Sequence, residues 1–226
     1  MLISFFKPDF LPTFIRKANT LISASRISKS YGSFPVLDIT DLQWQKGLYW
    51  IKGTNGSGKS TLLKILAGLL PFKGDIIINN QYSIHKHPVA YRALVNHAPA
   101  EPQYPSFLTG QQLVDFYLHV KKGTQSTVAE VKQSLGIDNY LSNPIGTYSS
   151  GMLKKLSLLL AFIGQPAWIL LDEPFTTLDV PSQIALQKLI QAQTDAGVIF
   201  TSHHDVDTET LPLTGIFTIR DKKLLP

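Results

Sequence analysis

One segment constrains this chain more than any other: residues 53–61 read GTNGSGKST and match the pattern G-x-x-x-x-G-K-[ST]. The segment directly follows an apolar stretch, residues 48–51, that is typical of a buried strand, and it leads into STLLKILAGL, which is typical of a helix. A strand, this loop and a helix in that order form a phosphate-binding loop. The alternative, a flexible Gly/Ser turn with an incidental lysine, leaves the flanking strand and helix unexplained.

The residue types of the loop explain how it would bind an anion. Gly53, Gly56 and Gly58 lack a β-carbon, so successive N–H groups can turn toward a phosphate chain. Lys59 supplies a positive charge for the β- and γ-phosphates, and Ser60 offers a hydroxyl to Mg²⁺ at the positive end of the following helix. We therefore expect phosphates to be bound by Gly53, Asn55, Gly56, Ser57, Gly58, Lys59, Ser60 and Thr61.

Composition limits the kind of chain that carries this loop. Its 226 residues, 44% hydrophobic and 16% charged, suffice for one α/β domain with a full core, or for one with a small insertion. The absence of cysteine excludes disulfides and thiolate metal sites and fits a reducing cytosol. The net charge of +5 contains no run of more than two Lys or Arg residues, so we expect no nucleic-acid partner.

The sequence predicts no membrane-spanning helix, because no run approaches about 18 consecutive apolar residues. Residues 1–20, MLISFFKPDFLPTFIRKANT, are rich in Phe, Leu and Ile, but charged residues and prolines interrupt them. They do not have the pattern of a signal peptide. We interpret them as an N-terminal extension, either an arm for a membrane surface or partner, or a segment packed on the domain or frayed.

Periodicity and turn residues predict an alternation of strands and helices. Strands are expected at 21–27, 36–44, 47–52, 75–78, near 95, and at 167–171, 197–201, 215–220 and 223–225, and helices at 60–69, 110–122, 127–135, 150–163 and 181–193. Buried strands separated by helices favour a wound parallel sheet. The predicted fold is α/β, a phosphate-loop NTPase core with a mainly parallel sheet, an antiparallel β subdomain on its N-terminal side and an inserted helical subdomain at about 85–163.

A second apolar strand ends in two acids, in the sequence WILLDEP at 168–174. Ligands of open α/β sheets bind at the carboxyl ends of the strands. Asp172 is placed to reach Mg²⁺, directly or through water. Glu173 is the candidate to orient and deprotonate an attacking water. The alternative, two solvated acids at a strand end, is disfavoured in a chain that also carries a phosphate loop.

A third segment, YSSGM at 148–152, precedes a Leu-rich helix. The Ser149 hydroxyl and the free N–H groups near Gly151 can hold a phosphate at this helix start. Taken alone, the segment is better explained as an ordinary serine cap that opens an amphipathic helix.

As an ordered set, GTNGSGKST, YSSGM, ILLDEP, TTLD and a strand followed by Ser-His resemble the ATP-binding cassette (ABC) ATPases over about 21–226. The resemblance implies ATP and Mg²⁺, with Ser60 and Asp172 as metal ligands. It also implies a catalytic group of Glu173, Lys59 and His203, where His203 contacts the γ-phosphate and His204 is the alternative if the alignment shifts by one residue.

The resemblance assigns two further positions. Tyr31 matches the aromatic residue that stacks on adenine, and the alternative is a tyrosine of a hairpin turn. Asp179, in the loop after the catalytic acid, matches a residue at a dimer contact, and the alternative is a plain helix cap before Pro181.

Two positions depart from the pattern of the family. In the common L-S-G-G-Q element, Ser150 replaces the first glycine, and Tyr148 and Met152 replace Leu and Gln. Ala100 stands where the loop between core and helical subdomain usually has Gln or Glu, with Glu101 and Gln103 as possible substitutes. Coupling to a partner subunit is therefore less strongly predicted than hydrolysis.

One chain carries one set of motifs, and in this family Ser149 and Gly151 contact the ATP of the opposite subunit. The resemblance therefore implies a head-to-tail dimer, with a second copy or a homologous cassette and two composite sites. We expect the ATP-hydrolysing subunit of an ABC transporter on the cytoplasmic face of the membrane, docked on a separate membrane permease. The YSxGM form favours export. The alternatives are a soluble cassette ATPase that acts on ribosomes or nucleic acid, and a small-molecule kinase, which leaves YSSGM and Ser-His unexplained.

Overall fold

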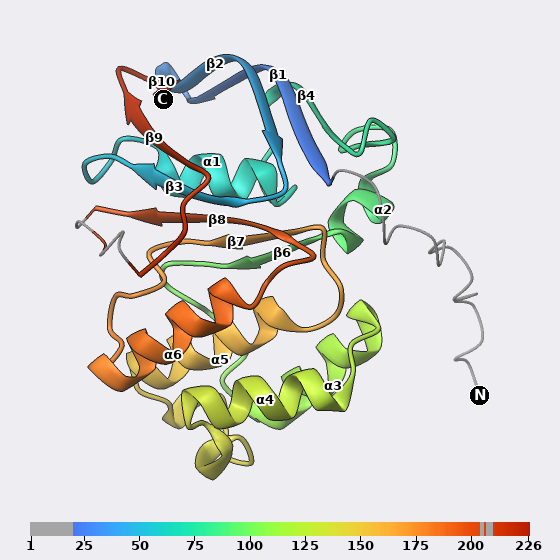
Figure 1. Cartoon of the computed structure of the whole chain (residues 1–226), viewed down its shortest axis with the longest axis vertical. Helices are drawn as coiled ribbons and strands as arrows, with labels where there is room; N and C mark the ends of the chain where they lie inside the picture. The colour runs from blue at the N-terminus through green and yellow to red at the C-terminus, as the bar shows by residue number, and fades with distance from the viewer. Residues whose placement is uncertain (1–19, 204–205, 207–209) are drawn as a thin grey trace.

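The described part of the chain, residues 20–203, 206 and 210–226 of this computed structural model, contains two β-sheets (Figure 1). The strands are β1 (Leu21–Tyr31), β2 (Phe34–Gln45), β3 (Leu48–Lys52), β4 (Lys73–Ile78), β5 (Tyr82–Ser83), β6 (Val95–Ala98), β7 (Trp168–Leu171), β8 (Gly197–Ser202), β9 (Gly215–Arg220) and β10 (Lys223–Leu225). The helices are α1 (Lys59–Leu66), α2 (Pro88–Ala93), α3 (Gly110–Lys121), α4 (Gln125–Leu135), α5 (Ser150–Phe162) and α6 (Val180–Gln191), with short 3₁₀ helices at Asp138–Tyr140 and Ile145–Thr147. Residues 1–19 of the expected N-terminal extension and His204 lie outside the described residues.

The larger sheet has the order β10-β9-β3-β8-β7-β6, and every pair in it is parallel except β10 with β9. This confirms the predicted wound parallel core. Because the strands are parallel, the carboxyl ends of β3, β7 and β8 lie at one edge of the sheet. The segments that follow these strands are the GTNGSGKST loop, the two acids and the Ser-His pair.

The central strands are apolar along their whole length because both faces of the sheet are covered. Figure 1 shows α1 between the two sheets, and α5 and α6 on the opposite face of the larger sheet, with α3 and α4 beyond them. Successive side chains of β7 alternate between these two cores: Leu170 packs on the α1 side and Ile169 on the side of α5 and α6. On that second side, Trp50 and Phe200 stack with ring centroids 5.9 Å apart.

The smaller sheet, β2-β1-β4-β5, is antiparallel, as predicted for the N-terminal side. Its first hairpin is longer than expected, because β1 continues to Tyr31 and pairs there with Phe34. Gly32, at φ 59°, makes the tight turn possible. Helix α1 ends three residues earlier than predicted, because the Gly68 N–H bonds back to the Ile65 carbonyl at a φ of 70°.

Helices of the middle region start and end at residues suited to their positions. Thr109 and Gln112 form a capping box at the start of α3, and Thr124 caps α4, which ends at Gly136 in the left-handed conformation. The range 85–163 also contains β6, the edge strand of the larger sheet. Among the described residues, no helix has both the length and the apolar character needed to cross a membrane.

Candidate functional site

The phosphate loop connects β3 to α1 and ends at a helix start that has no side-chain cap. Gly58 is the N-cap residue of α1, with a φ of 107°, and no side chain accepts a hydrogen bond there. The first N–H groups of a helix have no partner within the helix, so this end of α1 can offer them to an anion.

The loop has the shape of an anion cradle. Gly53 has a φ of 156°, and a β-carbon on it would lie 2.5 Å from Ser57 Oγ. Gly56 and Gly58 also have positive φ values, of 79° and 107°. Among the described residues, the buried Ser57 Oγ has no hydrogen-bond partner. A buried hydroxyl without a partner, in a loop whose positive φ values favour glycine at three positions, fits a site for phosphate oxygens.

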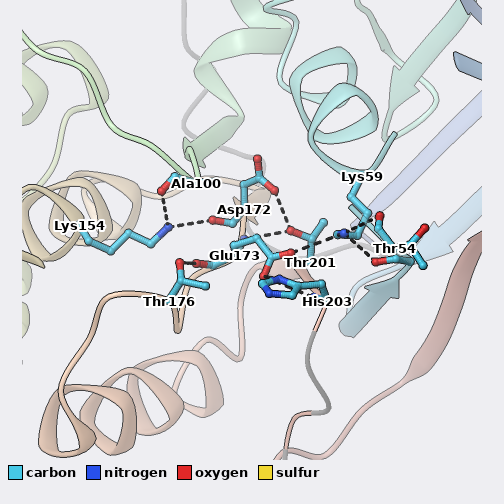
Figure 2. A network of polar contacts seen from close by, with 10 residues as sticks. Thr54, Lys59, Ala100, Lys154, Asp172, Glu173, Thr176, Thr201 and His203 are labelled. Atoms are coloured by element: carbon cyan, nitrogen blue, oxygen red, sulfur yellow. Dashed lines mark hydrogen bonds and ion pairs between the residues drawn. The ribbon is translucent and has the colours of Figure 1, made fainter. Parts of the chain in front are cut away.

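Lys59, the first residue of α1, points into this loop (Figure 2). Its Nζ donates hydrogen bonds to the carbonyl oxygens of Gly53 at 2.7 Å and Thr54 at 3.2 Å. It also lies 3.6 Å from Glu173 Oε1, and only 6% of the Lys59 side chain is exposed. The ammonium group is thus held between the loop and the acid that follows β7.

The hydroxyl of Thr201, on β8, holds both acids that follow β7. It donates a hydrogen bond to Asp172 Oδ1 at 2.7 Å and accepts one from the Glu173 backbone N–H at 2.9 Å. Asp172 is 1% exposed. Glu173 adopts a φ of 45°, which is uncommon for a residue with a side chain and turns its carboxylate toward Lys59 (Figure 2).

Glu173 also contacts the histidine that follows β8. Its Oε2 lies 3.0 Å from His203 Nδ1 and accepts a hydrogen bond from the His203 backbone N–H at 3.4 Å. The structure therefore places Lys59, Glu173 and His203, the three residues predicted to be catalytic, in one contiguous group at the carboxyl edge of the sheet (Figure 2).

The donors predicted for Mg²⁺ are an alcohol and a carboxylate. Ser60 is half-buried in the first turn of α1, and Asp172 is buried at the end of β7. Oxygen atoms are the ligands that Mg²⁺ prefers, and it usually retains water and substrate phosphates as further ligands. Within the described ranges no group of three or more His, Cys, Asp or Glu side chains could hold a metal by itself. This sparse oxygen set fits an ion that arrives with phosphates.

Ser149, Gly151 and Asp179 lie at helix starts, and no hydrogen bond or ion pair in the described residues joins them to the phosphate loop. Ser149 caps α5 by accepting from Met152 N at 3.2 Å. Asp179 caps α6 by accepting from Ser182 N at 2.9 Å. Within one chain, both residues thus act as helix caps. Their proposed contacts with a second chain stay predictions.

The pKa of the Asp179 carboxyl is lowered to about 2, chiefly by its hydrogen bonds to Ser182 and then by Lys155, whose Nζ lies 3.2 Å away. Asp179 therefore stays charged at neutral pH, as its cap of α6 requires.

Tyr31 ends β1 beside the hairpin turn, with 49% of its surface exposed. The Lys29 ammonium lies 5.0 Å from the centre of its ring. The hairpin is close to the phosphate loop, because the Val36 and Leu37 side chains surround Gly58. An exposed aromatic face at this place is compatible with base stacking, which stays a prediction.

Sequence reasoning missed two residues of the site, Thr201 and Lys154. Thr201 carries a weak signal, as the last residue before Ser-His at a strand end. Lys154 carries none, because a lysine in an amphipathic helix is expected to face solvent. It is instead 1% exposed, and its Nζ donates to the carbonyls of Asp172 at 2.9 Å and of Pro99 and Ala100 at 3.2 Å each. Burial lowers the pKa of Lys154 to about 8, although Asp172 and Glu173 act in the opposite direction.

The loop after β6 approaches the site only through its backbone. Ala100 has no polar side chain, and Glu101 and Gln103, the predicted substitutes, are both exposed. His97, on β6, has a buried Nε2 without a hydrogen-bond partner among the described residues. Burial is the main cause that lowers its pKa to about 4; Lys64 and Lys154 act in the same direction and Asp172 acts against them, so His97 is neutral at pH 7.

Comparison with known proteins identifies a family of similar sequence. The profile of the family described as ABC transporter matches residues 39–176. Cytochrome c biogenesis ATP-binding export protein CcmA of Legionella pneumophila (strain Lens) is 32% identical over 163 residues, which cover 71% of this chain and 80% of that protein. Glucosylceramide transporter ABCA12 of Mus musculus is 32% identical over 170 residues, 72% of this chain. The chain spans only 7% of the length of that relative.

Solved structures share the fold. A structure described as an ATP binding subunit of an ABC transporter superposes with a TM-score of 0.80 at 24% identity, covering 91% of this chain and 88% of the other. A bacterial Atm1-family ABC exporter with ATP bound gives a TM-score of 0.78 at 16% identity, covering 92% of this chain and 38% of that one. The predicted phosphate-loop NTPase fold is thereby confirmed.

Proposed function

Since this chain belongs to the ABC transporter family, whose ATP-binding domains hydrolyse ATP, we propose that it is the ATPase subunit of an exporter and that its Glu173 acts as the general base. One observation carries the proposal: the Glu173 carboxylate lies between Lys59 Nζ, at 3.6 Å, and His203 Nδ1, at 3.0 Å, beside the phosphate loop. A carboxylate held between these two nitrogen atoms, next to the phosphate loop, supports a role for Glu173 opposite the terminal phosphate of a bound nucleotide.

In the proposed reaction, a water oxygen forms a bond to the γ-phosphorus while the bond from that phosphorus to the bridging oxygen of ADP breaks. Glu173 takes up the proton of the water, and the products are ADP and inorganic phosphate. Lys59 and the loop N–H groups stabilise charge on the phosphate oxygens, and His203 contacts the γ-phosphate. Ser60 and Asp172 would hold Mg²⁺, which supplies further neutralisation of the β- and γ-phosphates.

Two such chains would complete each other's sites. Ser149 is exposed at the start of α5, where helix N–H groups and a small hydroxyl side chain suit contact with a nucleotide held by a second copy. Asp179 is exposed at the start of α6, where its carboxylate can contact the second chain itself. We propose a head-to-tail dimer in which ATP, bound by one chain through Lys59, is covered by Ser149 and Gly151 of the other. ATP would close this dimer because it contacts both chains, and hydrolysis would open it.

The export assignment and the membrane partner rest on the relatives. One of them is named as an ATP-binding export protein, and the alignment covers 80% of its length. We propose that this chain docks on a separate membrane permease at the cytoplasmic face. Purification of the tagged chain from detergent-solubilised membranes should recover a protein with spanning helices. Recovery with ribosomes would instead support the soluble cassette class.

Substitution of Glu173 tests the site. Glu173→Gln removes the base without changing the shape of the side chain, so kcat should fall by about 100-fold or more. Nucleotide affinity should persist, because Lys59 and the loop are unchanged. The matched control is Glu130→Gln, which neutralises an exposed carboxylate on α4, outside the cluster. Turnover by Glu173→Gln at the normal rate would exclude Glu173 as the base.

A second pair of variants tests the phosphate loop. Lys59→Ala should lose most nucleotide affinity, measured by equilibrium binding of a fluorescent ATP analogue. Lys64→Ala removes the same charge from an exposed position of the same helix and should bind normally. Equal affinity in both variants would contradict the role of the loop.

A further inference from the structure

Lys154 is the one lysine of α5 whose side chain is fully buried, and all of its polar contacts in the described structure are with backbone carbonyls. Its Nζ joins the Asp172 carbonyl, just after β7, to the Ala100 carbonyl, in the loop after β6 (Figure 2). It also donates to the carbonyl of Pro99 in the same loop. These three acceptors use the three N–H donors of a lysine completely.

Burial of an ammonium group costs considerable free energy unless every donor is paired. An apolar side chain of similar length would fill the same space without that cost. The charged residue therefore does something that packing alone does not require: it fixes two chain segments relative to each other. One of these segments contains Asp172, the residue proposed to hold Mg²⁺, and the next residue along is Glu173.

The same helix begins at the proposed contact with the second copy. Ser149 is the N-cap of α5, and Lys154 follows five residues later, about one and a half turns along the helix. Because Ser149 caps the same continuous helix that carries Lys154, we expect a displacement of its start to reach Lys154. The far end of α5 is held to β6, because Asn96 Nδ2 donates to the Ala161 carbonyl at 2.9 Å and the Ile163 carbonyl at 2.8 Å.

We propose that Lys154 is a positioning residue that links the two half-sites of one chain: contact at Ser149 with the nucleotide of the second copy is passed through α5 to Asp172 and Glu173. This inference rests on the proposed function, since it uses the composite dimer. Ala100, with no polar side chain of its own, is tied to the sheet edge through its carbonyl and Lys154.

Substitution of Lys154 by Met, which has a similar length and no donors, tests the link. Nucleotide affinity without Mg²⁺ should stay within about twofold, because the phosphate loop is untouched. The kcat should fall about tenfold or more, and the Mg²⁺ concentration for half-maximal activity should rise several-fold, as expected when a residue that orients a metal ligand is lost. The control is Lys188→Met, which removes the charge of an exposed lysine in the last turn of α6.

A double-mutant cycle separates positioning from simple packing. If α5 transmits the contact, Ser149→Ala and Lys154→Met should have non-additive effects on kcat. Additive effects, or a folded Lys154→Met variant with normal kcat and Mg²⁺ dependence, would overturn the proposal. If Lys154→Met does not fold, the uncharged Lys154→Gln variant takes its place in the same cycle, with the same criteria.

The Glu173→Gln variant distinguishes failure of the proposed ATPase function from failure of the proposed link through Lys154. Normal ATPase activity of Glu173→Gln would contradict the proposed function. Loss of ATPase activity in Glu173→Gln, together with normal activity in the Lys154 variants, would contradict only the proposed role of Lys154.

Discussion

At the scale of single residues, the hydroxyl of Thr201 connects the two acids of the site. It is fully buried, and it pairs the Asp172 carboxylate with the Glu173 backbone N–H. Thr201→Val keeps the shape but leaves that N–H unpaired, so the free energy of unfolding should fall by about 1–3 kcal/mol. The kcat should fall too, because both carboxylates lose their orientation.

Denaturant unfolding and steady-state ATPase assays check the two effects of Thr201→Val. Thr201→Ser, which keeps the hydroxyl, should retain most of the activity. A valine variant with the kcat of the native chain would show that the acids are positioned by something else.

The residues that could be predicted from sequence are those whose chemistry lies in a local pattern. Lys59 follows from the loop pattern, and Glu173 from an acid pair after an apolar strand. Thr201 and Lys154 could not be predicted, because their importance arises only when β8 and α5 pack against the end of β7. A buried lysine in particular has no local signature, since the same spacing fits a solvated helix face.

At the scale of elements, the end of α5 depends on a strand that is distant in sequence. The last carbonyls of a helix have no partner within it. Two carbonyls at the end of α5, those of Ala161 and Ile163, accept hydrogen bonds from Asn96 on β6. Asn96→Ala should lower the free energy of unfolding by about 1–2 kcal/mol, because it leaves both carbonyls unpaired. The cost is moderated because the substitution also removes Asn96 Oδ1, which has no partner among the described residues.

Denaturant unfolding measures this effect, and Asn143→Ala, at an exposed position, is the control. Nucleotide affinity should not change, since Asn96 lies away from the loop. A loss of affinity with unchanged stability would contradict a purely structural role for Asn96.

Most elements could be predicted, because a buried parallel strand and an amphipathic helix each leave a strong pattern. Their limits were harder to predict. Strand β1 extends to Tyr31 through half-buried and exposed residues that show no alternation, since hydrogen bonding across the hairpin decides its length. Helix α1 stops at Leu66, where the backbone turns at Gly68, although the apolar pattern continues.

At the scale of the whole molecule, the parallel sheet brings one half of a site together and leaves the other half exposed. The loop, the acids and His203 converge because β3, β7 and β8 end at the same edge. Ser149, at the start of α5, caps its own helix and makes no hydrogen bond to that group in the described chain. If the proposed dimer is correct, two inactive variants that lack different halves of the site should regain ATPase activity when they are mixed.

Lys59→Ala removes the loop half of a site, and Ser149→Asp removes the other half. Aspartate still caps α5, so the fold should persist while its charge repels a phosphate. Each variant alone should be nearly inactive. In an equimolar mixture, half of the dimers pair the two variants, and each of these contains one intact site out of two. ATPase activity should therefore recover to at most about a quarter of the native value per chain. It should stay below a quarter if the link through α5 operates, because the intact site belongs to the chain whose own Ser149 is replaced. Ser149→Asn, which caps without charge, should keep more activity than Ser149→Asp. If the mixture is no more active than its components, each chain works alone and the composite site is wrong.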